Sequence, residues 1–298
     1  MPIPSPRALR ALTAALLGCL TLLAPSAHAL EITAGDYEQL PAGTQVGLLY
    51  LQQASGTDLY AHGEQVVSGF KVRSQVAIWR YIRTLQVTAN TTFDANLILP
   101  MAQVKGDGLA ASLGQTHGVG DLVVGGAFKT LLDPVSRDVL AIAPFLTLPT
   151  GSHDPARPLN VGENRWKLLV QGVYVRHFNA QWALDTAADL TWFARQNRFG
   201  PAHATQSTAL RTEVQGHLRH NLSPATTVSV GVGHIQGAEN TVDGVRQGDA
   251  LGSTYGRLTL GHFIDQTTQL QAQWGRDLSV RTGVQTSQQL NLRLMKLF

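Results

Sequence analysis

Cysteine is almost absent from this chain, which has 298 residues and a single cysteine, Cys19. One cysteine cannot close an internal disulfide, and it cannot supply the several thiolates of a zinc or iron–sulfur site. Charge is also sparse, because only 14% of the residues are Asp, Glu, Lys or Arg. No block of like charge occurs, so the sequence gives no sign of a polyanion-binding tail.

Long apolar runs are lacking after the N-terminal region. A membrane-spanning helix needs roughly 18 or more apolar residues in succession, and no later segment provides them. The one apolar run, Ala11 to Ala24, follows Arg7 and Arg10 and precedes Ala27-His28-Ala29. A basic region, a short apolar run and an A-x-A site in this order predict a secretory signal peptide over 1–29.

Cleavage after Ala29 would leave one domain over 30–298. A lipoprotein signal ending at Cys19 is the alternative, but Leu17 fits that pattern poorly and apolar residues continue beyond the cysteine. Cleavage also removes two arginines, so Lys and Arg fall from 23 to 21 against 20 acidic residues, and the net charge falls from +3 to +1. We therefore expect no nucleic-acid partner.

Alternation of apolar and polar residues is the strongest pattern in the remaining chain. In 181–195 one face carries Trp182, Leu184, Leu190 and Trp192, and in 268–280 Leu270 and Trp274 alternate with glutamines. A period of two is that of a β-strand with one apolar and one polar face. The segments that suit such strands are 44–53, 69–82, 85–99, 119–131, 139–148, 165–178, 181–195, 207–222, 226–235, 253–264, 268–280 and 287–298.

The connections between these segments differ in length in a regular way. Short ones lie at 83–84, 132–138, 179–180, 223–225 and 265–267, and they alternate with mostly long ones at 54–68, 100–118, 149–164, 196–206, 236–252 and 281–286. Outer-membrane barrels have short periplasmic turns and longer outward loops, with an even number of strands. The sequence therefore predicts an all-β fold, a transmembrane antiparallel up-and-down barrel of about 12 strands.

The last predicted strand alternates up to Phe298. Leu290, Leu292, Leu294 and Phe298 share one face, and Asn291 lies on the other. Such a strand suits the closing position of a barrel, with its aromatic residue at a membrane interface. We expect Phe298 to form part of the signal read by the barrel-assembly machinery, and outer-membrane lipid to surround the barrel.

One block of residues resembles a known family. Leu159-Asn160-Val161-Gly162-Glu163-Asn164-Arg165-Trp166, preceded by Leu148-Pro149-Thr150-Gly151-Ser152, is similar to the bacterial transporter-like outer-membrane family named for the meta-pathway of phenol degradation. The resemblance covers most of the chain after the signal peptide. It implies an outer-membrane barrel that takes up small, largely hydrophobic or aromatic compounds.

The same block provides the first candidate site, because it lies where the connection 149–164 enters a strand. Arg165 can bind the carboxylate of Glu163 or of Asp154, and Trp166 can anchor at the outer interface. The block formed by Asn160, Glu163, Asn164, Arg165 and Trp166 is then either a constriction at the pore mouth or a staple between loop and barrel. We favour the staple.

A second candidate set faces the interior of the predicted barrel. Its charged members are Lys167, Asp185, Asp189, Glu213, Arg219, Arg257 and Arg293. Charges inside a narrow barrel must be paired or hydrated. Because both signs occur and no ring of a single sign is present, we expect a hydrated or salt-bridged lumen without strong ion selectivity.

Enzymatic and metal chemistry find little support. Two histidines three apart in a strand, His217 and His220, point to opposite faces, so we expect no metal site and no cofactor. No His-x-Ser-Asn-Gly block of an outer-membrane phospholipase occurs. The match Gly231-x-Gly233-x-x-x-Gly237 leads from a strand into a loop, where no helix could hold phosphate.

We therefore expect a passive conduit for small-molecule solutes in the outer membrane of a Gram-negative bacterium. An outer-membrane lipid hydrolase is the first alternative, and a structural or adhesive barrel without transport is the second. The substrate, a plug inside the barrel and the oligomeric state stay open.

Overall fold

The computed structural model of the chain describes residues 31–298. The predicted signal peptide and its cleavage site lie outside the described residues. Within residues 31–298 the structure has no helix with the length and apolar composition of a membrane span.

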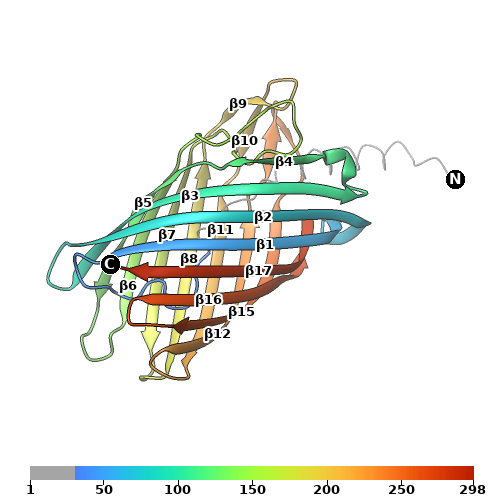
Figure 1. The fold of residues 1–298 in the computed structure, drawn as a ribbon. Coiled ribbons are helices and arrows are strands. Elements are labelled where there is room, and N and C mark those ends of the chain that lie inside the picture. The colour runs from blue at the N-terminus through green and yellow to red at the C-terminus, as the bar shows by residue number, and fades with distance from the viewer. Residues whose placement is uncertain (1–30) are drawn as a thin grey trace.

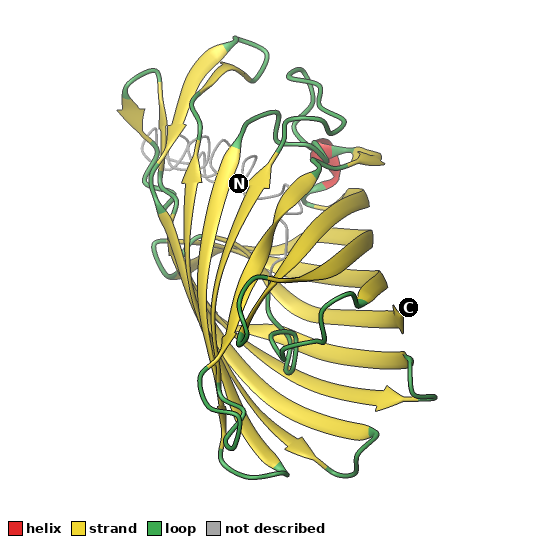
Figure 2. Cartoon of the chain, turned by 90° about the vertical axis from the view of Figure 1, so that its left-hand side faces the viewer, coloured by secondary structure: helices red, strands yellow, loops and turns green. Residues whose placement is uncertain are grey.

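A single curved layer of antiparallel strands closes on itself (Figure 1, Figure 2). Neighbouring strands pair in the order β2-β1-β17-β16-β15-β12-β11-β8-β7-β6-β5-β3, and the pairing of β2 with β3 closes the ring. The barrel strands are β1 (Gln45–Ala61), β2 (Glu64–Gln86), β3 (Thr91–Gly108), β5 (Val123–Leu131), β6 (Val139–Thr147), β7 (Lys167–His177), β8 (Trp182–Phe193), β11 (Arg211–Asn221), β12 (Thr226–Gly237), β15 (Leu251–Phe263), β16 (Thr268–Val280) and β17 (Gly283–Leu297).

These strands confirm the predicted 12-stranded antiparallel barrel. The remaining elements belong to the loops: η2 (Ala111–Leu113), β4 (Gln115–Val119), β9 (Gln196–Phe199), β10 (Ala204–Thr208), β13 (Asn240–Val242) and β14 (Val245–Arg246). β4 folds back along β3, and β9, β10, β13 and β14 form a small separate sheet. We call the end of the barrel that carries these elements the mouth.

The predicted connection at 54–68 is wrong. β1 and β2 continue beyond the other strands and meet at His62 and Gly63, so the mouth has a two-residue turn there. The predicted short turn at 83–84 is also misplaced, because β2 runs to Gln86 and the turn occupies 87–90. The connections 100–118 and 281–286 are likewise partly strand. The predicted arrangement, with long connections at the mouth and short turns at the other end, therefore holds for only some of the connections at the mouth.

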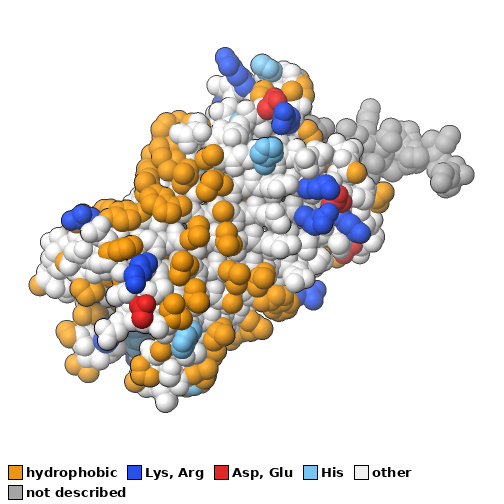
Figure 3. Space-filling model, viewed as in Figure 1, with side chains coloured by type: hydrophobic (Ala, Val, Ile, Leu, Met, Phe, Trp, Pro, Cys, Tyr) orange, Lys and Arg blue, Asp and Glu red, His pale blue; other side chains and the backbone are white. Residues whose placement is uncertain are grey.

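The outer face of the wall is apolar. Large hydrophobic side chains alternate outward along the strands. On the face of the barrel seen in Figure 3 they gather in a band that crosses the strands. On β8 this outward row contains Trp182, Leu190 and Trp192, which are 39%, 40% and 44% exposed. An exposed apolar band with aromatic residues near both ends is the surface that a β-barrel presents to lipid.

Two glycines on the inner face give space to large side chains. A β-carbon at Gly233 would lie 2.2 Å from Cζ of Tyr255, and one at Gly231 would lie 2.2 Å from Nδ1 of His217. Both of these partners are buried. The glycine pattern at 231–237 thus reflects packing inside the barrel.

The first and the last strand are paired along the seam, with an irregularity around Gly56. β1 and β17 are antiparallel from Val46 opposite Leu297 to Tyr60 opposite Gly283. At the end opposite the mouth, the main-chain N–H of Phe298 donates to the carbonyl of Gln45 at 2.9 Å. The Phe298 side chain is 75% exposed beside this seam.

Candidate functional site

The segment 31–43 precedes β1; it lies inside the barrel from Glu31 to Leu40 and is exposed at 41–43. Its partners come from β5, β7, β11, β15 and β17, on opposite sides of the ring. For example, the N–H of Ile32 donates to Oε1 of Gln215 on β11 at 3.1 Å, and the hydroxyl of Tyr37 donates to Oε1 of Gln171 on β7. We call residues 31–43 the lumen segment.

Ion pairs join the lumen segment to three arginines of the wall. Oε1 of Glu31 lies 2.7 Å from Nε of Arg257. Oδ1 of Asp36 lies 2.6 Å from Nη1 of Arg293. The third pair joins Glu38 to Arg219. Each of these predicted inward-facing arginines therefore meets one acid of the lumen segment. Charge complementarity of this kind fixes where the segment lies, because an unpaired buried charge is costly.

The ammonium of Lys129 adds a fourth anchor. Its Nζ donates to the main-chain carbonyls of Asp36 and Glu38, both at 3.0 Å, and lies 2.8 Å from the carboxylate of Asp94. His177 contacts Glu38 at 2.8 Å between Nε2 and Oε1. These contacts hold the segment by its backbone as well as by its carboxylates.

Part of the inner wall is apolar, beside the salt-bridged side chains that the sequence predicts. Ile32 and Tyr37 pack in one cluster with buried residues of the wall, among them Phe145, Leu169 and Val173. Leu40 packs against the same cluster. The lumen segment thus covers an apolar surface that would otherwise face water, and burial of that surface stabilises the segment in place.

A cavity of about 10 Å³ lies between Glu31 and Asp36 and the inner faces of β1, β16 and β17. Such a volume accommodates about one water molecule. The lumen segment therefore packs closely against this part of the wall.

The three inward-facing acids of the predicted set lie on the wall itself. Asp185 is 3.1 Å from Nε of Arg219. Asp189 accepts from Gln215 at 3.4 Å, and Glu213 accepts from the hydroxyl of Tyr255 at 2.6 Å. Mixed charge inside the barrel is therefore organised into pairs and hydrogen bonds.

At the mouth, the carboxylate of Glu163 forms ion pairs with two basic side chains. Its Oε2 accepts from Nε and Nη2 of Arg165 at 3.0 and 2.9 Å, and its Oε1 accepts from Lys167 at 2.6 Å. Asp154, the other carboxylate considered for Arg165, instead pairs with Arg157 at 3.2 Å. Asp154 is thus the wrong partner.

The same cluster joins three long loops and the short connection that contains Asp121. Asp121 accepts from the N–H of Glu163 at 2.7 Å and from that of Gly151 at 2.8 Å. On the other side, Nη1 of Arg165 donates to the hydroxyl of Thr208 at 2.6 Å, and that hydroxyl donates to Asn240 at 2.6 Å. Loops 148–166, 194–210 and 238–250 are therefore held together around Arg165.

The other members of the predicted block have local roles. The side chain of Asn160 accepts from the N–H of Asp154 at 2.7 Å and donates to the carbonyl of Arg157 at 3.1 Å, so it shapes the loop tip. Asn164 has a left-handed backbone with φ 53°, a conformation that asparagine tolerates. Trp166 is 49% exposed on the outer face.

The electrostatics of Glu163 predict an acid-resistant mouth. Burial acts to raise its pKa, but the attraction of Lys167 and Arg165 and their hydrogen bonds lower it well below the ordinary value of 4.5. Ionised Glu163 therefore stabilises the loop at every pH above about 4.5, and this stabilisation is lost only as the pH falls through the lower folded pKa. We expect pepsin to cut within 153–162 only well below that value.

Replacing Lys167 with Met provides the comparison for this prediction. It removes the largest attraction acting on Glu163, so burial then dominates and cleavage is expected to begin about one pH unit higher or more. Mass spectrometry of the fragments at each pH locates the cuts. Identical cleavage profiles for the wild type and Lys167→Met would contradict this account of Glu163.

Sequence reasoning missed the lumen segment and the partners of the mouth cluster. The available sign of the segment was three acids, Glu31, Asp36 and Glu38, placed just before the first strand. For Asp121 the sign was its position at the end of a loop, in the stretch Gly118-Val119-Gly120-Asp121. Thr208 and Asn240 gave no sign that distinguishes them from other polar loop residues.

A closed ring of antiparallel strands with an apolar outer band and a charged inner face defines the class of transmembrane β-barrels. Within that class, the chain belongs to the family described as "Putative MetA-pathway of phenol degradation", whose model matches residues 55–294.

Solved structures agree with this assignment. An outer-membrane channel from Pseudomonas putida F1 is 37% identical and superposes with a TM-score of 0.88, over 90% of this chain and 100% of that one. The translocator domain of the autotransporter NalP from Neisseria meningitidis is 10% identical over 91% of this chain and 93% of its own, with a TM-score of 0.52. The transport unit of AIDA-I from Escherichia coli is 9% identical over 95% and 96%, with a TM-score of 0.54. These last two share the barrel fold alone. No curated protein matches the chain.

Proposed function

We propose that this protein is a passive channel of the bacterial outer membrane that admits small, largely hydrophobic or aromatic compounds, and that the lumen segment is its internal gate. The observation that carries the proposal is the lumen segment itself, held across a closed barrel by three acid–arginine pairs. Similarity to an outer-membrane channel over 90% of the chain supports the conduit.

The gate follows from the way in which the segment is held. Its contacts are ion pairs and hydrogen bonds at separate points, together with a small apolar surface at Ile32 and Tyr37. The barrel wall does not need the segment for its own hydrogen bonds, because the ring closes through β2 and β3. The segment can therefore leave the lumen while the wall stays folded.

Export, assembly and surroundings complete the proposal. Residues 1–29 would direct export, outer-membrane lipid would cover the apolar band, and the barrel-assembly machinery would bind the last strand with Phe298. Transport through such a barrel requires no cofactor and no covalent step. The lipid hydrolase and the adhesive barrel are alternatives that the same experiment tests.

The experiment compares swelling of proteoliposomes in phenylalanine and in glucose, which have similar size and cross lipid slowly. We expect the protein to accelerate swelling, more strongly with the aromatic solute, and to release no fatty acid from an ester substrate. Swelling is measured for the wild type and for a variant with Glu31, Asp36 and Glu38 neutralised. If the protein hydrolyses the ester and a single Ser→Ala change abolishes that activity, the function is that of a hydrolase and the channel proposal fails. No flux from either protein would leave a barrel without transport.

A further inference from the structure

An open groove of about 540 Å³ crosses the outer face of the wall, over β17, β1, β2, β3 and β4. Ala77 on β2 pairs with Leu51 on β1 and with Met101 on β3, and all three line the groove. The short side chain of Ala77 leaves a hollow between its two longer neighbours. The other outward side chains of the lining are those of Gln53, Gln75, Gln103, Val119, Leu290 and Leu292. The groove is therefore mostly apolar, with a row of glutamines along its edge towards the mouth.

Beyond the glutamines the same strands carry a group of basic side chains. On β2, Gln75 is followed towards the mouth by Arg73 and Lys71 at successive outward positions. On β3, Gln103 is followed in the same way by Lys105, which lies directly opposite Arg73. We call Lys71, Arg73 and Lys105 the basic group. Figure 3 shows basic side chains gathered beyond the apolar band, over the mouth ends of β1, β2 and β3.

The basic group carries more charge than its acidic neighbour neutralises. Oδ2 of Asp107 accepts from Nε of Arg73 at 2.9 Å, and Oδ1 lies 2.9 Å from Nζ of Lys105. Lys71 takes part in no ion pair among residues 31–298. The other acids of this hairpin lie farther towards its tip: Asp58 and Glu64. Like charges opposite each other on neighbouring strands destabilise a sheet, and a bound anion would offset that repulsion.

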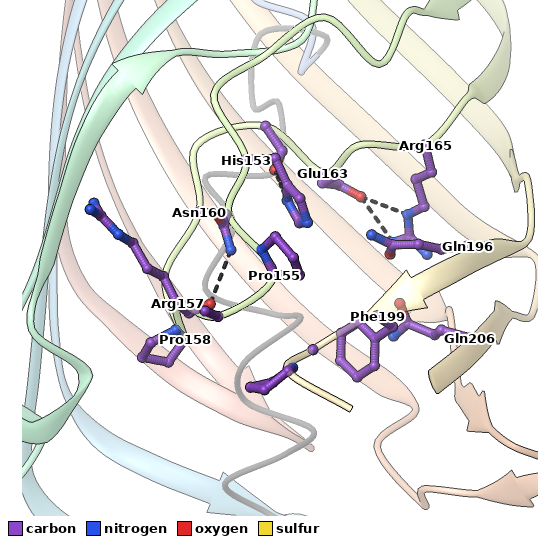
Figure 4. Close-up of a pocket in the computed structure, with 14 residues that line it drawn as sticks. His153, Pro155, Arg157, Pro158, Asn160, Glu163, Arg165, Gln196, Phe199 and Gln206 are labelled. Atoms are coloured by element: carbon purple, nitrogen blue, oxygen red, sulfur yellow. Dashed lines mark hydrogen bonds and ion pairs between the residues drawn. The ribbon is translucent and has the colours of Figure 1, made fainter. Parts of the chain in front are cut away.

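The loop cavity drawn in Figure 4 has, by contrast, paired charges. Arg165 binds Glu163 there, and Arg157 pairs with Asp154. Lys167 shares the carboxylate of Glu163. These basic residues offer no surplus charge to an anion, whereas the basic group does.

The position along the strands places the basic group at the depth of lipid headgroups. On β3 the outward residues are apolar from Phe93 to Met101, which spans roughly 27 Å along the strand at about 3.4 Å per residue. In a tilted strand, a run of this length crosses most of an apolar band about 25 Å tall. Lys105 lies two outward positions beyond Met101. Because the longer loops of such barrels face outward, these headgroups are those of the outer leaflet.

We propose that the groove and the basic group together bind a phosphate-bearing lipid of the outer leaflet. Its phosphate lies among Lys71, Arg73 and Lys105, and one acyl chain lies in the groove over Ala77. Arginine binds phosphate through a planar fork and lysine as a compact charge, so the basic group offers both modes. The proposal rests on the proposed placement of the barrel in the outer membrane with its mouth at the cell surface, and it does not require solute transport.

The test measures binding to the full-length protein in detergent by native mass spectrometry. The probes are diphosphoryl lipid A, the same lipid with its phosphates removed, and inorganic phosphate. We expect the phosphorylated lipid to bind at least about tenfold more tightly than the dephosphorylated form, because each basic residue at the membrane surface attracts an anionic headgroup. Inorganic phosphate is expected to bind more weakly than the phosphorylated lipid, because it cannot occupy the groove. Equal affinity for the two lipids, or for inorganic phosphate and the phosphorylated lipid, would overturn the proposal.

Two charge variants assign the headgroup to the basic group. Lys71→Gln/Arg73→Gln/Lys105→Gln is expected to abolish the preference for the phosphorylated lipid while the heat-modifiable gel shift of a folded barrel is kept. The control removes three positive charges from exposed residues of the mouth loops and is expected to keep the preference: Arg157→Gln/Arg198→Gln/Arg246→Gln. An equal loss of preference in the control would mean that overall charge, and not this site, selects the lipid.

A second pair of variants tests the groove. Ala77→Phe fills the hollow between Leu51 and Met101 and is expected to weaken binding of both lipids. Ala188→Phe makes the same change at an exposed position on the outer face of β8, outside the groove, and is expected to leave both affinities unchanged. Unchanged lipid affinity in Ala77→Phe would contradict an acyl chain in the groove.

Lipid binding and transport can fail separately. If solutes cross proteoliposomes but the wild type does not distinguish the two lipids, the lipid site fails and the channel stands. If the wild type prefers the phosphorylated lipid but no solute crosses, the channel fails and the lipid site stands.

Discussion

Neutralising the acids of the lumen segment is expected to open the barrel. In the variant Glu31→Gln/Asp36→Asn/Glu38→Gln, the arginines at 257, 293 and 219 each lose a carboxylate partner inside the wall. Removing one partner of a buried ion pair costs about 3–5 kcal/mol, because it leaves an uncompensated charge. Departure of the segment allows water to hydrate these arginines, so the variant should favour the open state.

The size of the effect follows from the remaining contacts. Arg219 keeps Asp185 at 3.1 Å, and Lys129 still donates to the segment's main chain. In the equilibrium between the closed and the open barrel, each 1.4 kcal/mol is about a factor of ten. Loss of the stabilisation from a single ion pair therefore raises the open population at least about tenfold. We expect the mean current of single channels in planar bilayers to rise by at least about that factor.

A matched variant controls for the change in charge. Asp107, Asp154 and Glu239 also pair with arginines, but those arginines are 58%, 63% and 77% exposed. Exposed pairs contribute little, so Asp107→Asn/Asp154→Asn/Glu239→Gln should leave the current unchanged. The gate would be contradicted if the lumen variant carried the same current as the wild type and its lumen segment stayed protected from proteases. These ion pairs would then not hold the channel closed.

The barrel wall was predictable because alternation is a local property. In 268–280 each outward Leu or Trp is separated from the next outward position by one inward residue, and the structure has a strand with these bounds. No knowledge of partners is needed to assign such faces. The predicted strand count succeeded for the same reason.

Prediction failed where a bulge interrupts the alternation. β1 pairs with both neighbours through register shifts around Gly56. A β-carbon at Gly56 would lie 2.4 Å from the carbonyl oxygen of Gln285, so the close approach of two strands requires glycine there. A bulge shifts the faces by one residue. The stretch around Ser55, Gly56 and Thr57 therefore had the pattern of a loop although it continues a strand.

The lumen segment was beyond local reasoning for a different reason. Glu38 and Arg219 are separated by 181 positions, and Asp36 and Arg293 by 257. No repeat or spacing relates them, and the strand pattern places the arginines inward without naming their partners. At the mouth the sequence offered Glu163 and Asp154 as partners of Arg165, and only the loop conformation set by Asn160 and Asp121 decides between them.

Gly233 offers the sharpest test of packing inside the wall. A β-carbon there would lie 2.2 Å from Cζ of Tyr255, whose residue is 1% exposed. The Tyr255 hydroxyl also donates to Glu213 at 2.6 Å, so the ring cannot turn away without breaking that bond. Overpacking a filled interior costs about 1–3 kcal/mol, and loss of the buried hydrogen bond adds to this cost.

We therefore expect Gly233→Ala to lower the temperature at which the barrel loses its heat-modifiable gel shift, whereas Gly216→Ala leaves that temperature unchanged or slightly higher. Gly216 lies on the neighbouring strand, where a β-carbon would have no neighbouring atom within 4 Å, and alanine there reduces the freedom of the unfolded chain. The double change Gly233→Ala/Tyr255→Phe separates the two causes, since it keeps the steric clash while removing the hydroxyl. If Gly233→Ala loses its gel shift at the same temperature as the wild type, the inner wall has room for the added β-carbon. That result would contradict the close packing of Tyr255 against Gly233.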